Sequence, residues 1–338
     1  MIAVAVSGGR DSLLALALLA EAGEEVLALH AFFLPPEPKS RHTAEGLGAQ
    51  CARLGVAFKT LDLSADFERL VIEPFVAAYA AGATPNPCAG CNRDVKFGLL
   101  LSQAQALRAS RLATGHYARA EGGGLTRGLD PTKDQSYFLS LVPRGMIGLA
   151  QFPLGGWRKS QVMGALIERG LAPPLPGESQ EVCFIPGDDY RAFLESRHPG
   201  LSGPGPITLA HGQEIGRHQG LWRYTIGQRR GLNLPFAHPL YVLDKLFESN
   251  VLVVGAKEQL QARTCRITAL NILVDPTDWP ESVLAQTSYR QAPRPARAEW
   301  QGADLTLDFA ADLPRPTPGQ VGAVYDQAGR VLAGGLIA

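Results

Sequence analysis

A six-residue string near the start of the chain, Ser7-Gly-Gly-Arg-Asp-Ser12, separates an apolar run from a helix-forming segment. Residues 2–6 predict a short buried strand, and residues 13–22 predict a helix packed on a sheet. A turn between a strand and a helix directs backbone amides and the positive end of the helix toward one point, which favours an anion. The string therefore predicts a phosphate-binding turn at the edge of an α/β sheet.

The residue types within this string suit a phosphate group. Gly8 and Gly9 let the backbone approach a ligand closely, and polar groups come from Ser7, Asp11 and Ser12. The alternative is a glycine turn in which Asp11 or Ser12 only caps the helix. The Gly-Lys-Ser/Thr ending of a Walker loop is missing. The string instead resembles the PP-loop of the ATP pyrophosphatase superfamily, whose members cleave ATP to AMP and pyrophosphate while adenylating a carbonyl oxygen.

Strand and helix signals alternate along the first third of the chain. Further strands are predicted at residues 26–33, 58–61 and 111–114, and further helices at residues 43–54, 67–81 and 93–107. Strands that alternate with helices of this length predict a mostly parallel sheet covered on both faces.

The pattern changes after Leu194. Residues 200–206 are rich in Gly and Pro and suit a linker. Short strand signals then replace the helices, at residues 251–254, 265–270, 305–309 and 321–325. The last part of the chain therefore predicts an all-β barrel.

Charge gives little indication of a partner for the whole molecule. The 338 residues contain 32 Lys and Arg and 32 Asp and Glu, so there is no overall bias toward a polyanion. Arginines nevertheless cluster locally, which fits either a solvated surface or a phosphate-binding face. The clustered residues are Arg223, Arg229, Arg230, Arg290, Arg294 and Arg297.

Apolar segments are too short for a membrane protein. No run of about eighteen apolar residues occurs, and Ser7-Gly-Gly interrupts the apolar start too early for a signal peptide. We therefore expect a cytoplasmic protein with no membrane partner. In that compartment the 5 cysteines stay mainly as thiols, so we expect catalytic or metal-binding use and not a disulfide framework.

Three cysteines are candidates for chemistry. Cys88 and Cys91 follow the string Thr84-Pro-Asn-Pro and precede the helix predicted from Arg93, so the helix dipole and the Cys-x-x-Cys pair predict a lowered pKa for Cys91. Cys183 lies in Glu181-Val-Cys-Phe-Ile185, at an expected strand end. The other two cysteines, Cys51 and Cys265, are expected to be buried and inert.

Two functions fit the three thiols. Cys183 could carry a persulfide whose sulfur is released when Cys91 forms a disulfide with it, or Cys88, Cys91 and Cys183 could bind three irons of a 4Fe-4S cluster. A zinc site would need a fourth protein ligand, for which His116 is the candidate.

Taken together, the motifs resemble those of the tRNA-specific 2-thiouridylase family. The resemblance implies an N-terminal PP-loop domain of the adenine nucleotide alpha hydrolase type (residues 1–199), a small central domain that contacts tRNA (200–262) and a C-terminal β-barrel (263–338). The matching strings are Ser7 to Ser12, Thr84 to Gly98, Ala113 to Arg119, Lys133 to Leu139, Val182 to Ile185 and Tyr224 to Leu232.

The resemblance also implies a reaction. ATP, with Mg²⁺, adenylates the 2-oxygen of the wobble uridine in tRNAs for Lys, Glu and Gln, and sulfur from a donor such as a cysteine desulfurase displaces AMP. Single-stranded anticodon loops are where a base is extruded at least cost. By this similarity Cys91, Cys183 and Asp11 are catalytic. ATP would bind at Ser7, Gly8, Gly9, Asp11, Ser12 and Gly115, and tRNA at Lys133, Asp134, Gln135, Arg229 and Arg230.

The sequence departs from the family pattern in two places. Most members have Asp where this chain has Cys88, which favours the cluster, and Phe32–Pro38 replaces the usual Met-x-x-Trp segment. Three alternatives therefore stay open. They are a PP-loop paralogue that thiolates another RNA, one that acts on a small carbonyl compound, and a non-catalytic sulfur-relay protein that binds tRNA.

Overall fold

The computed structural model describes residues 1–175, 177, 182–198 and 200–338. Its N-terminal part contains a five-stranded sheet in the order β3-β2-β1-β4-β7, and every neighbouring pair is parallel. The strands are β1 (Ile2–Ala5), β2 (Val26–Phe32), β3 (Ala57–Asp62), β4 (Arg111–Ala113) and β7 (Ala150–Gln151). The prediction of a parallel sheet is confirmed.

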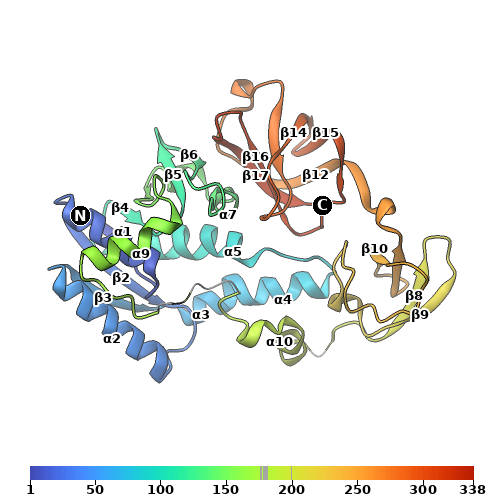
Figure 1. The fold of residues 1–338 in the computed structure, drawn as a ribbon, viewed down its shortest axis with the longest axis horizontal. Coiled ribbons are helices and arrows are strands. Elements are labelled where there is room, and N and C mark those ends of the chain that lie inside the picture. Colours follow the sequence, from blue (N-terminus) through green and yellow to red (C-terminus); the bar gives the residue numbers. More distant parts are fainter. Residues whose placement is uncertain (176, 178–181, 199) are drawn as a thin grey trace.

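Helices cover both faces of this sheet (Figure 1). Alternate strand residues face opposite sides, so Ile2, Val4 and Ala28 pack with α1 and α2, whereas Ala3 and Leu29 pack with the helical run of residues 87–106. Helices on the α1 side are α1 (Arg10–Glu21), α2 (Pro38–Arg53) and α9 (Lys159–Glu168). The opposite run consists of α5 (Pro87–Gly90), the π-helical η2 (Cys91–Leu100) and α6 (Leu101–Ala106).

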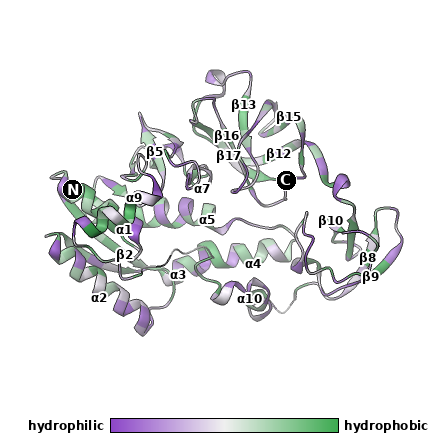
Figure 2. Ribbon diagram, in the orientation of Figure 1, coloured by the Kyte–Doolittle hydropathy of each residue, from purple (hydrophilic) through white to green (hydrophobic). Residues whose placement is uncertain are grey.

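Hydropathy follows this burial (Figure 2). Helix α1 is mainly hydrophobic because it is covered on most sides, whereas α2 has hydrophilic stretches toward solvent. Shorter elements complete the N-terminal part: α3 (Ser64–Phe67), η1 (Glu68–Ile72), α4 (Glu73–Ala80), β5 (Ala118–Glu121), β6 (Gly124–Arg127), α7 (Ser136–Leu139), α8 (Arg144–Ile147), η3 (Pro186–Asp188) and α10 (Tyr190–Arg197). None of the helices in the described part of the chain has the length and hydrophobicity to cross a membrane.

A four-stranded sheet in the order β10-β11-β8-β9 forms the central part. Its core consists of apolar residues such as Ile207, Val242 and Leu252. The elements are β8 (Gly205–Leu209), β9 (Glu214–His218), η4 (Leu221–Arg223), β10 (Tyr241–Leu246), β11 (Val251–Gly255) and η5 (Lys257–Leu260).

The C-terminal part is a closed six-stranded barrel, as predicted. Its strands are β12 (Gln261–Ile272), β13 (Val283–Gln286), β14 (Arg294–Gln301), β15 (Asp304–Pro314), β16 (Val321–Tyr325) and β17 (Val331–Ile337), with η6 (Pro276–Asp278) between the first two. One side of the barrel shares a hydrophobic cluster with the N-terminal part, where the Tyr137 hydroxyl donates to the Val321 carbonyl at 2.8 Å. The predicted combination of α/β domain, small central domain and barrel is confirmed.

Two local predictions were wrong. The helix predicted from Arg93 begins at Pro87, because the Asn86 side chain caps it by accepting from the Ala89 amide at 3.3 Å. The strand end predicted at Cys183 is a turn, closed by a hydrogen bond from the Ile185 amide to the Val182 carbonyl at 3.0 Å. Glu181, the first residue of that string, lies outside the described residues.

Candidate active site

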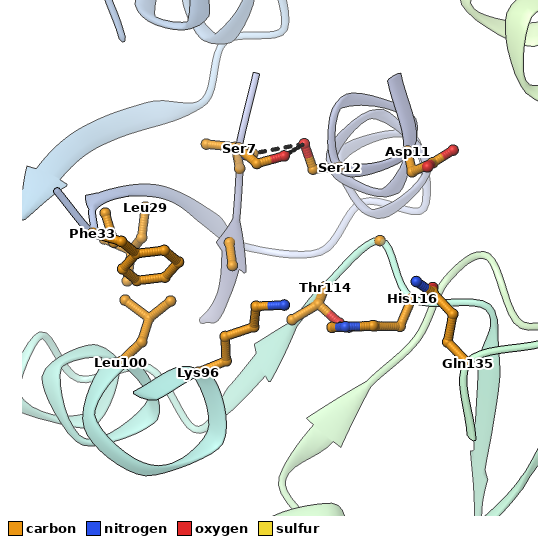
Figure 3. Close-up of a pocket in the computed structure, with 14 residues that line it drawn as sticks. Ser7, Asp11, Ser12, Leu29, Phe33, Lys96, Leu100, Thr114, His116 and Gln135 are labelled. Atoms are coloured by element: carbon orange, nitrogen blue, oxygen red, sulfur yellow. Dashed lines mark hydrogen bonds between the residues drawn. The ribbon is translucent and has the colours of Figure 1, made fainter. Parts of the chain in front are cut away.

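A cavity of about 210 Å³ lies at the carboxyl ends of β1, β2 and β4 (Figure 3). The strand order reverses between β1 and β4, since β2 and β3 lie on one side of β1 and β4 and β7 on the other. Ligands of open α/β sheets bind at such a point. The lining residues are Ala5, Val6, Ser7, Asp11, Ser12, Leu29, Ala31, Phe33, Lys96, Leu100, Thr114, Gly115, His116 and Gln135.

The predicted phosphate-binding turn forms one wall. Ser7 and Ser12 face each other, with their hydroxyl oxygens 3.3 Å apart, and the Ser7 amide donates to Ser12 Oγ at 3.1 Å. Gly8 has a φ of 93°, and a Cβ there would lie 2.8 Å from Thr43 Cγ2. Only glycine fits this conformation and this space. The turn therefore leaves a compact wall of hydroxyl and amide groups in front of α1.

The opposite wall is apolar at one end and cationic in the middle. Leu29, Phe33 and Leu100 form the apolar end, and the Lys96 side chain extends between them and Thr114 (Figure 3). Within the described part of the chain, Lys96 has neither a hydrogen bond nor an ion pair. A cavity with an apolar end, a cation and a phosphate-binding turn has the chemistry to hold a nucleotide.

His116 lies beside Lys96 and is neutral. Burial, and secondarily the charge of Lys96, holds the pKa of His116 well below its ordinary value. Its Nδ1 lies 2.7 Å from the Thr114 hydroxyl oxygen. His116 is therefore a polar wall residue, and its ring is available for neutral hydrogen bonding.

Lys96 also connects the cavity to the three candidate thiols. Its charge lowers the pKa of Cys88, Cys91 and Cys183, against a larger opposing effect of burial. The cysteines interact electrostatically with one another as well, since Cys183 and Cys88 both raise the pKa of Cys91. Lys96 therefore lines the cavity and lies within electrostatic range of the three thiols, none of which lines the cavity itself.

The lowered pKa predicted for Cys91 was wrong. Burial raises its pKa to about 12, because Cys91 is only 7% exposed and lies among the aromatic residues that pack around α4 and α10. Its helix begins four residues earlier, at Pro87, so Cys91 is not at the positive end of the dipole. Cys88 and Cys183 are solvent-exposed, although neighbouring protein atoms still raise their pKa.

The arrangement of the three thiols does not fit a metal site. Over residues 1–175, 177, 182–198 and 200–338, no three His, Cys, Asp or Glu side chains are grouped so that they could hold a metal ion.

The other two cysteines, as predicted, are buried, and burial raises the pKa of Cys51 to about 11 and that of Cys265 to about 12.

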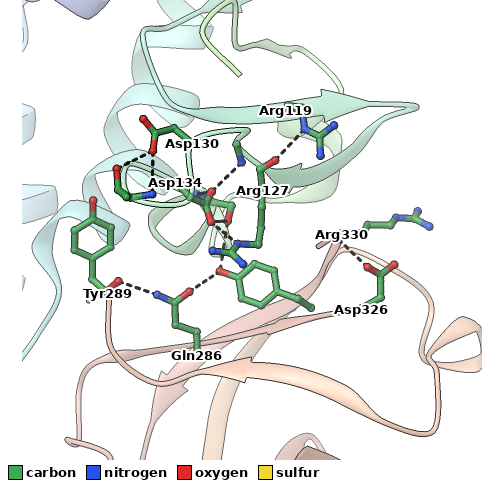
Figure 4. A network of polar contacts seen from close by, with 12 residues as sticks. Arg119, Arg127, Asp130, Asp134, Gln286, Tyr289, Asp326 and Arg330 are labelled. Atoms are coloured by element: carbon green, nitrogen blue, oxygen red, sulfur yellow. Dashed lines mark hydrogen bonds and ion pairs between the residues drawn. The ribbon is translucent and has the colours of Figure 1, made fainter. Parts of the chain in front are cut away.

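The three residues predicted to bind tRNA at positions 133–135 differ in exposure. The Asp134 carboxylate is buried and accepts from Arg127 Nε at 2.6 Å, from the Gly128 amide at 3.0 Å and from the Ser136 amide and hydroxyl, both at 3.1 Å (Figure 4). Gln135 lines the cavity, and its Oε1 accepts from the Tyr117 amide at 3.0 Å. Lys133 is half-buried.

This segment is joined to the barrel. The Ser136 hydroxyl lies 3.4 Å from the Tyr325 hydroxyl, which donates to Gln286 Oε1 at 3.2 Å, and Gln286 Nε2 donates to the Tyr289 carbonyl at 2.9 Å (Figure 4). Asp134 therefore acts within the protein, as the anchor of a network that runs into the barrel.

The predicted arginine clusters divide into paired and unpaired residues. Arg223 pairs with Glu195 and lies over the Trp222 ring, and Arg297 pairs with Glu281 at 3.1 Å. Among the described residues, no carboxylate pairs with Arg229, Arg230 or Arg290. Arg229 and Arg230 are exposed on the central part and do not line the cavity.

Sequence reasoning missed one charged residue of the site. Lys159, the first residue of α9, donates from Nζ to both Asp11 oxygens, at 2.8 and 2.7 Å. No local pattern indicates this contact, because the two residues are 148 positions apart. Lys96 was within a recognised string but had no assigned role.

Comparison with known proteins gives matches along the whole chain. Residues 1–187 match the tRNA methyl transferase HUP domain, 191–256 the tRNA methyl transferase PRC-barrel domain, and 262–337 the aminomethyltransferase beta-barrel domain. Several relatives carry the name tRNA-specific 2-thiouridylase MnmA. The one from Nitratidesulfovibrio vulgaris (strain DSM 19637 / Miyazaki F) is 55% identical over 99% of this chain and 98% of its own. The one from Oleidesulfovibrio alaskensis is 53% identical over 100% and 99%.

Among solved structures, the U34-tRNA thiolase NcsA from Methanococcus maripaludis with its 4Fe-4S cluster aligns with 59% of this chain and 66% of its own. The TM-score is 0.37 and the sequence identity 18%. At these values the likeness has no bearing on the cofactor or the site of this chain.

Proposed function

The chain belongs to the family of tRNA-specific 2-thiouridylases and is a tRNA sulfurtransferase, and from this premise we propose how its site performs the reaction. ATP binds in the cavity, with its phosphates at Ser7, Gly8, Gly9, Ser12 and Gly115 and its adenine at the apolar end. The observation that supports this most directly is the position of Lys96, which lines the cavity beside the turn and whose charge lowers the pKa of all three thiols.

Adenylation is the first step. The 2-oxygen of the wobble uridine in tRNAs for Lys, Glu and Gln attacks the α-phosphorus of ATP, and pyrophosphate leaves. The backbone amides of the turn and the Lys96 ammonium stabilise the charge that develops on the phosphate oxygens. Mg²⁺ would be held mainly by the phosphates and by water, since Asp11, the single carboxylate among the described residues that line the cavity, is already paired with Lys159.

Sulfur transfer is the second step. A donor, such as a cysteine desulfurase of the cytoplasm, loads Cys183 with a persulfide, because this thiol is exposed and can be reached. The terminal sulfur attacks C2 of the adenylated uridine, and AMP leaves with the bonding electron pair. The Cys91 thiolate then attacks Cys183 Sγ, which breaks the persulfide S–S bond, leaves the sulfur on the uridine and forms a Cys91–Cys183 disulfide. An external thiol reduces this disulfide before the next turnover.

The test is formation of 2-thiouridine in unmodified tRNA with ATP and a sulfur donor. We expect product with the wild-type protein, and a loss of at least about a hundredfold with Cys91→Ser or Cys183→Ser, since each thiol takes part in a covalent step. Cys265→Ala, which removes an inert thiol from the barrel, is the matched control. Absence of 2-thiouridine in every cognate tRNA with wild-type protein would reject the proposal.

A 4Fe-4S cluster on Cys88, Cys91 and Cys183 is the second candidate route. The described residues offer no group of three His, Cys, Asp or Glu side chains that could hold a metal ion, which favours the persulfide route. Cys88→Ala distinguishes the routes. The persulfide route retains 2-thiouridine formation in this variant, whereas the cluster route loses activity together with bound iron and sulfide.

Binding of tRNA is tested by its salt dependence. The unpaired Arg229, Arg230 and Arg290 are the candidates for phosphate contacts. We expect the logarithm of tRNA affinity to fall with the logarithm of salt concentration, and Arg229→Gln to reduce the slope by about one. Arg111→Gln, at the opposite end of the parallel strands, is the control and should leave the slope unchanged.

A further inference from the structure

The carboxylate of Asp11 is unusual in its surroundings. Within the described part of the chain it is the only carboxylate that lines the cavity, although the cavity has the features of an anion site. The side chain of Asp11 is 32% exposed, and that of Lys159 16%. A negative charge at this place would repel a polyphosphate unless a positive charge compensates it.

Lys159 supplies this compensation with a fixed geometry. Its ammonium donates to both oxygens of Asp11, at 2.8 and 2.7 Å, and the Tyr117 hydroxyl adds a third hydrogen bond, to Oδ1, at 2.8 Å. The ammonium also lies 5.7 Å from the centre of the Tyr117 ring, within range of a cation–π contact. The Asp11 carboxylate is therefore bound by two residues, Lys159 and Tyr117, that are distant from it and from each other in sequence.

The backbone of Lys159 is held in place as well. Its amide donates to Asp130 Oδ2 at 2.9 Å, and the other Asp130 oxygen accepts from the Thr132 amide at 3.0 Å and from its hydroxyl at 2.7 Å. Asp130 is only 7% exposed. The first turn of α9 is thus fixed by the same segment, residues 130–136, that anchors the barrel through Asp134 and contacts the cavity through Gln135.

We propose that Lys159 is a positioning residue for ATP: it holds the Asp11 carboxylate in a single orientation and neutralises it, so that the triphosphate can enter the cavity. This inference rests on the proposed function, because it assumes that ATP binds here. Lys159 does not line the cavity, so its effect on the nucleotide passes through Asp11.

The experiment measures ATP affinity by calorimetry in the absence of tRNA. It compares the wild type with Lys159→Met and Lys159→Arg. The control is Lys59→Met, at an exposed position of β3. We expect Lys159→Met to weaken ATP binding about tenfold or more, because an unpaired carboxylate then faces the phosphates. Lys159→Arg should recover most of the affinity, and tRNA affinity should not change. In turnover, the effect of Lys159→Met should be larger on KM for ATP than on kcat.

A double-mutant cycle with Asp11→Asn tests whether Lys159 acts through Asp11. We expect Lys159→Met to have little further effect on ATP affinity in the Asp11→Asn background. The double variant also contains no unpaired charge, so it tests the inference even if Lys159→Met alone does not fold. Fully additive effects, or an affinity in Lys159→Met equal to that in Lys59→Met, would overturn the positioning role. A wild-type protein that does not bind ATP would reject the proposed function and this inference together.

Discussion

Gly115 has no side chain, so the segment after β4 can lie directly against the backbone of the phosphate-binding turn. A Cβ at this residue would lie 2.8 Å from the Asp11 carbonyl carbon and 2.8 Å from the Ser12 amide nitrogen. Both are backbone atoms of the turn, so they could not move without displacing it. We expect Gly115→Ala to cost about 1–3 kcal/mol of unfolding free energy. We also expect it to weaken ATP binding on the order of tenfold to a hundredfold, measured by calorimetry.

Gly145→Ala is the matched control for this substitution. A Cβ at Gly145, inside α8, would have no atom within 4 Å, and Ala has the higher helix propensity. This variant should bind ATP like the wild type and be equally or slightly more stable. If Gly115→Ala and Gly145→Ala bound ATP equally well, the contact between the β4 segment and the turn would have no role in nucleotide binding.

The pKa of Cys91 predicts how its reactivity depends on pH. Burial raises the pKa from 9.0 to about 12, and only the thiolate reacts. The alkylation rate of Cys91 should therefore rise about tenfold for each pH unit through the neutral and mildly alkaline range, without a plateau. Lys96→Met, which removes the lowering effect, should slow alkylation further at each pH. A plateau near neutral pH, measured by mass spectrometry of the labelled peptide, would contradict this prediction.

The same shift determines the sign of a stability effect. At a pH above its ordinary pKa, the Cys91 thiol is deprotonated in the unfolded chain but still protonated in the folded protein. The free energy of unfolding should therefore fall as the pH rises above about 9.

Residue-level prediction succeeded where the chemistry is local. The turn at Ser7–Ser12 could be recognised because glycines, hydroxyls and a helix start lie within six residues. The cysteines were found from their spacing, but the pKa of Cys91 depends on packing by Phe184 and other residues far along the chain. Lys159 could not be found, since its contact with Asp11 exists only after folding.

Among the secondary-structure elements, α10 supports the turn that contains Cys183. The Asp189 carboxylate caps α10 by accepting from the Arg191 amide at 3.2 Å and the Ala192 amide at 3.0 Å. One turn later, Phe193 packs on Phe184 with ring centres 5.5 Å apart. We expect Asp189→Ala to lower the free energy of unfolding by about 1 kcal/mol and to raise the labelling rate of Cys183, because the turn loses support.

Asp189→Asn separates the cap from the charge. Asn caps helices about as well as Asp, so this variant should match the wild type in urea unfolding and in Cys183 labelling. A destabilisation equal to that of Asp189→Ala would show that the charge, and not the cap, is what stabilises α10.

Element prediction worked best where apolar residues form a nearly continuous run. Strands at residues 26–33 and 321–325 were predicted from runs rich in apolar residues. The first corresponds to β2, which is buried in its middle, and the second to β16, which is buried throughout. The start of α5 was missed although Asn86-Pro87 is a strong helix-start signal. The prediction placed the two cysteines in a loop before the helix, and therefore began the helix at Arg93. Cys183 was assigned to a strand because Val182–Ile185 is apolar. In the structure this segment is a turn, and its apolar side chains pack into the core.

At the scale of the whole molecule, the loop of residues 83–86 joins the three parts just before Cys88 (Figure 1). The Thr84 amide donates to the Pro318 carbonyl of the barrel at 3.0 Å, and Gln320 Nε2 donates to the Thr84 carbonyl at 2.7 Å. The Thr84 hydroxyl lies 3.3 Å from that of Thr225 in the central part. These partners are 141 to 236 positions apart, so no sequence pattern could indicate them.

Gly319 tests whether this junction controls the thiols. Its φ is 87°, and a Cβ there would lie 2.8 Å from Ala83 Cβ and 3.1 Å from the Thr84 amide nitrogen. We expect Gly319→Ala to push the loop away from the barrel, to reduce 2-thiouridine formation on the order of tenfold or more, and to leave ATP affinity unchanged, because the phosphate-binding turn is not in contact with the loop.

Gly329→Ala provides the control for backbone strain. Gly329 also has a positive φ, 83°, but a Cβ there would meet only the Arg127 side chain, at 3.4 Å. Both substitutions should therefore lower the free energy of unfolding by about 1–2 kcal/mol, because Ala is strained in the left-handed conformation. Only Gly319→Ala adds a clash with the backbone of the loop. If the two variants lost the same stability and the same activity, strain alone would explain the effect. A loss of activity confined to Gly319→Ala would mean that the barrel holds the loop before Cys88 in its active position.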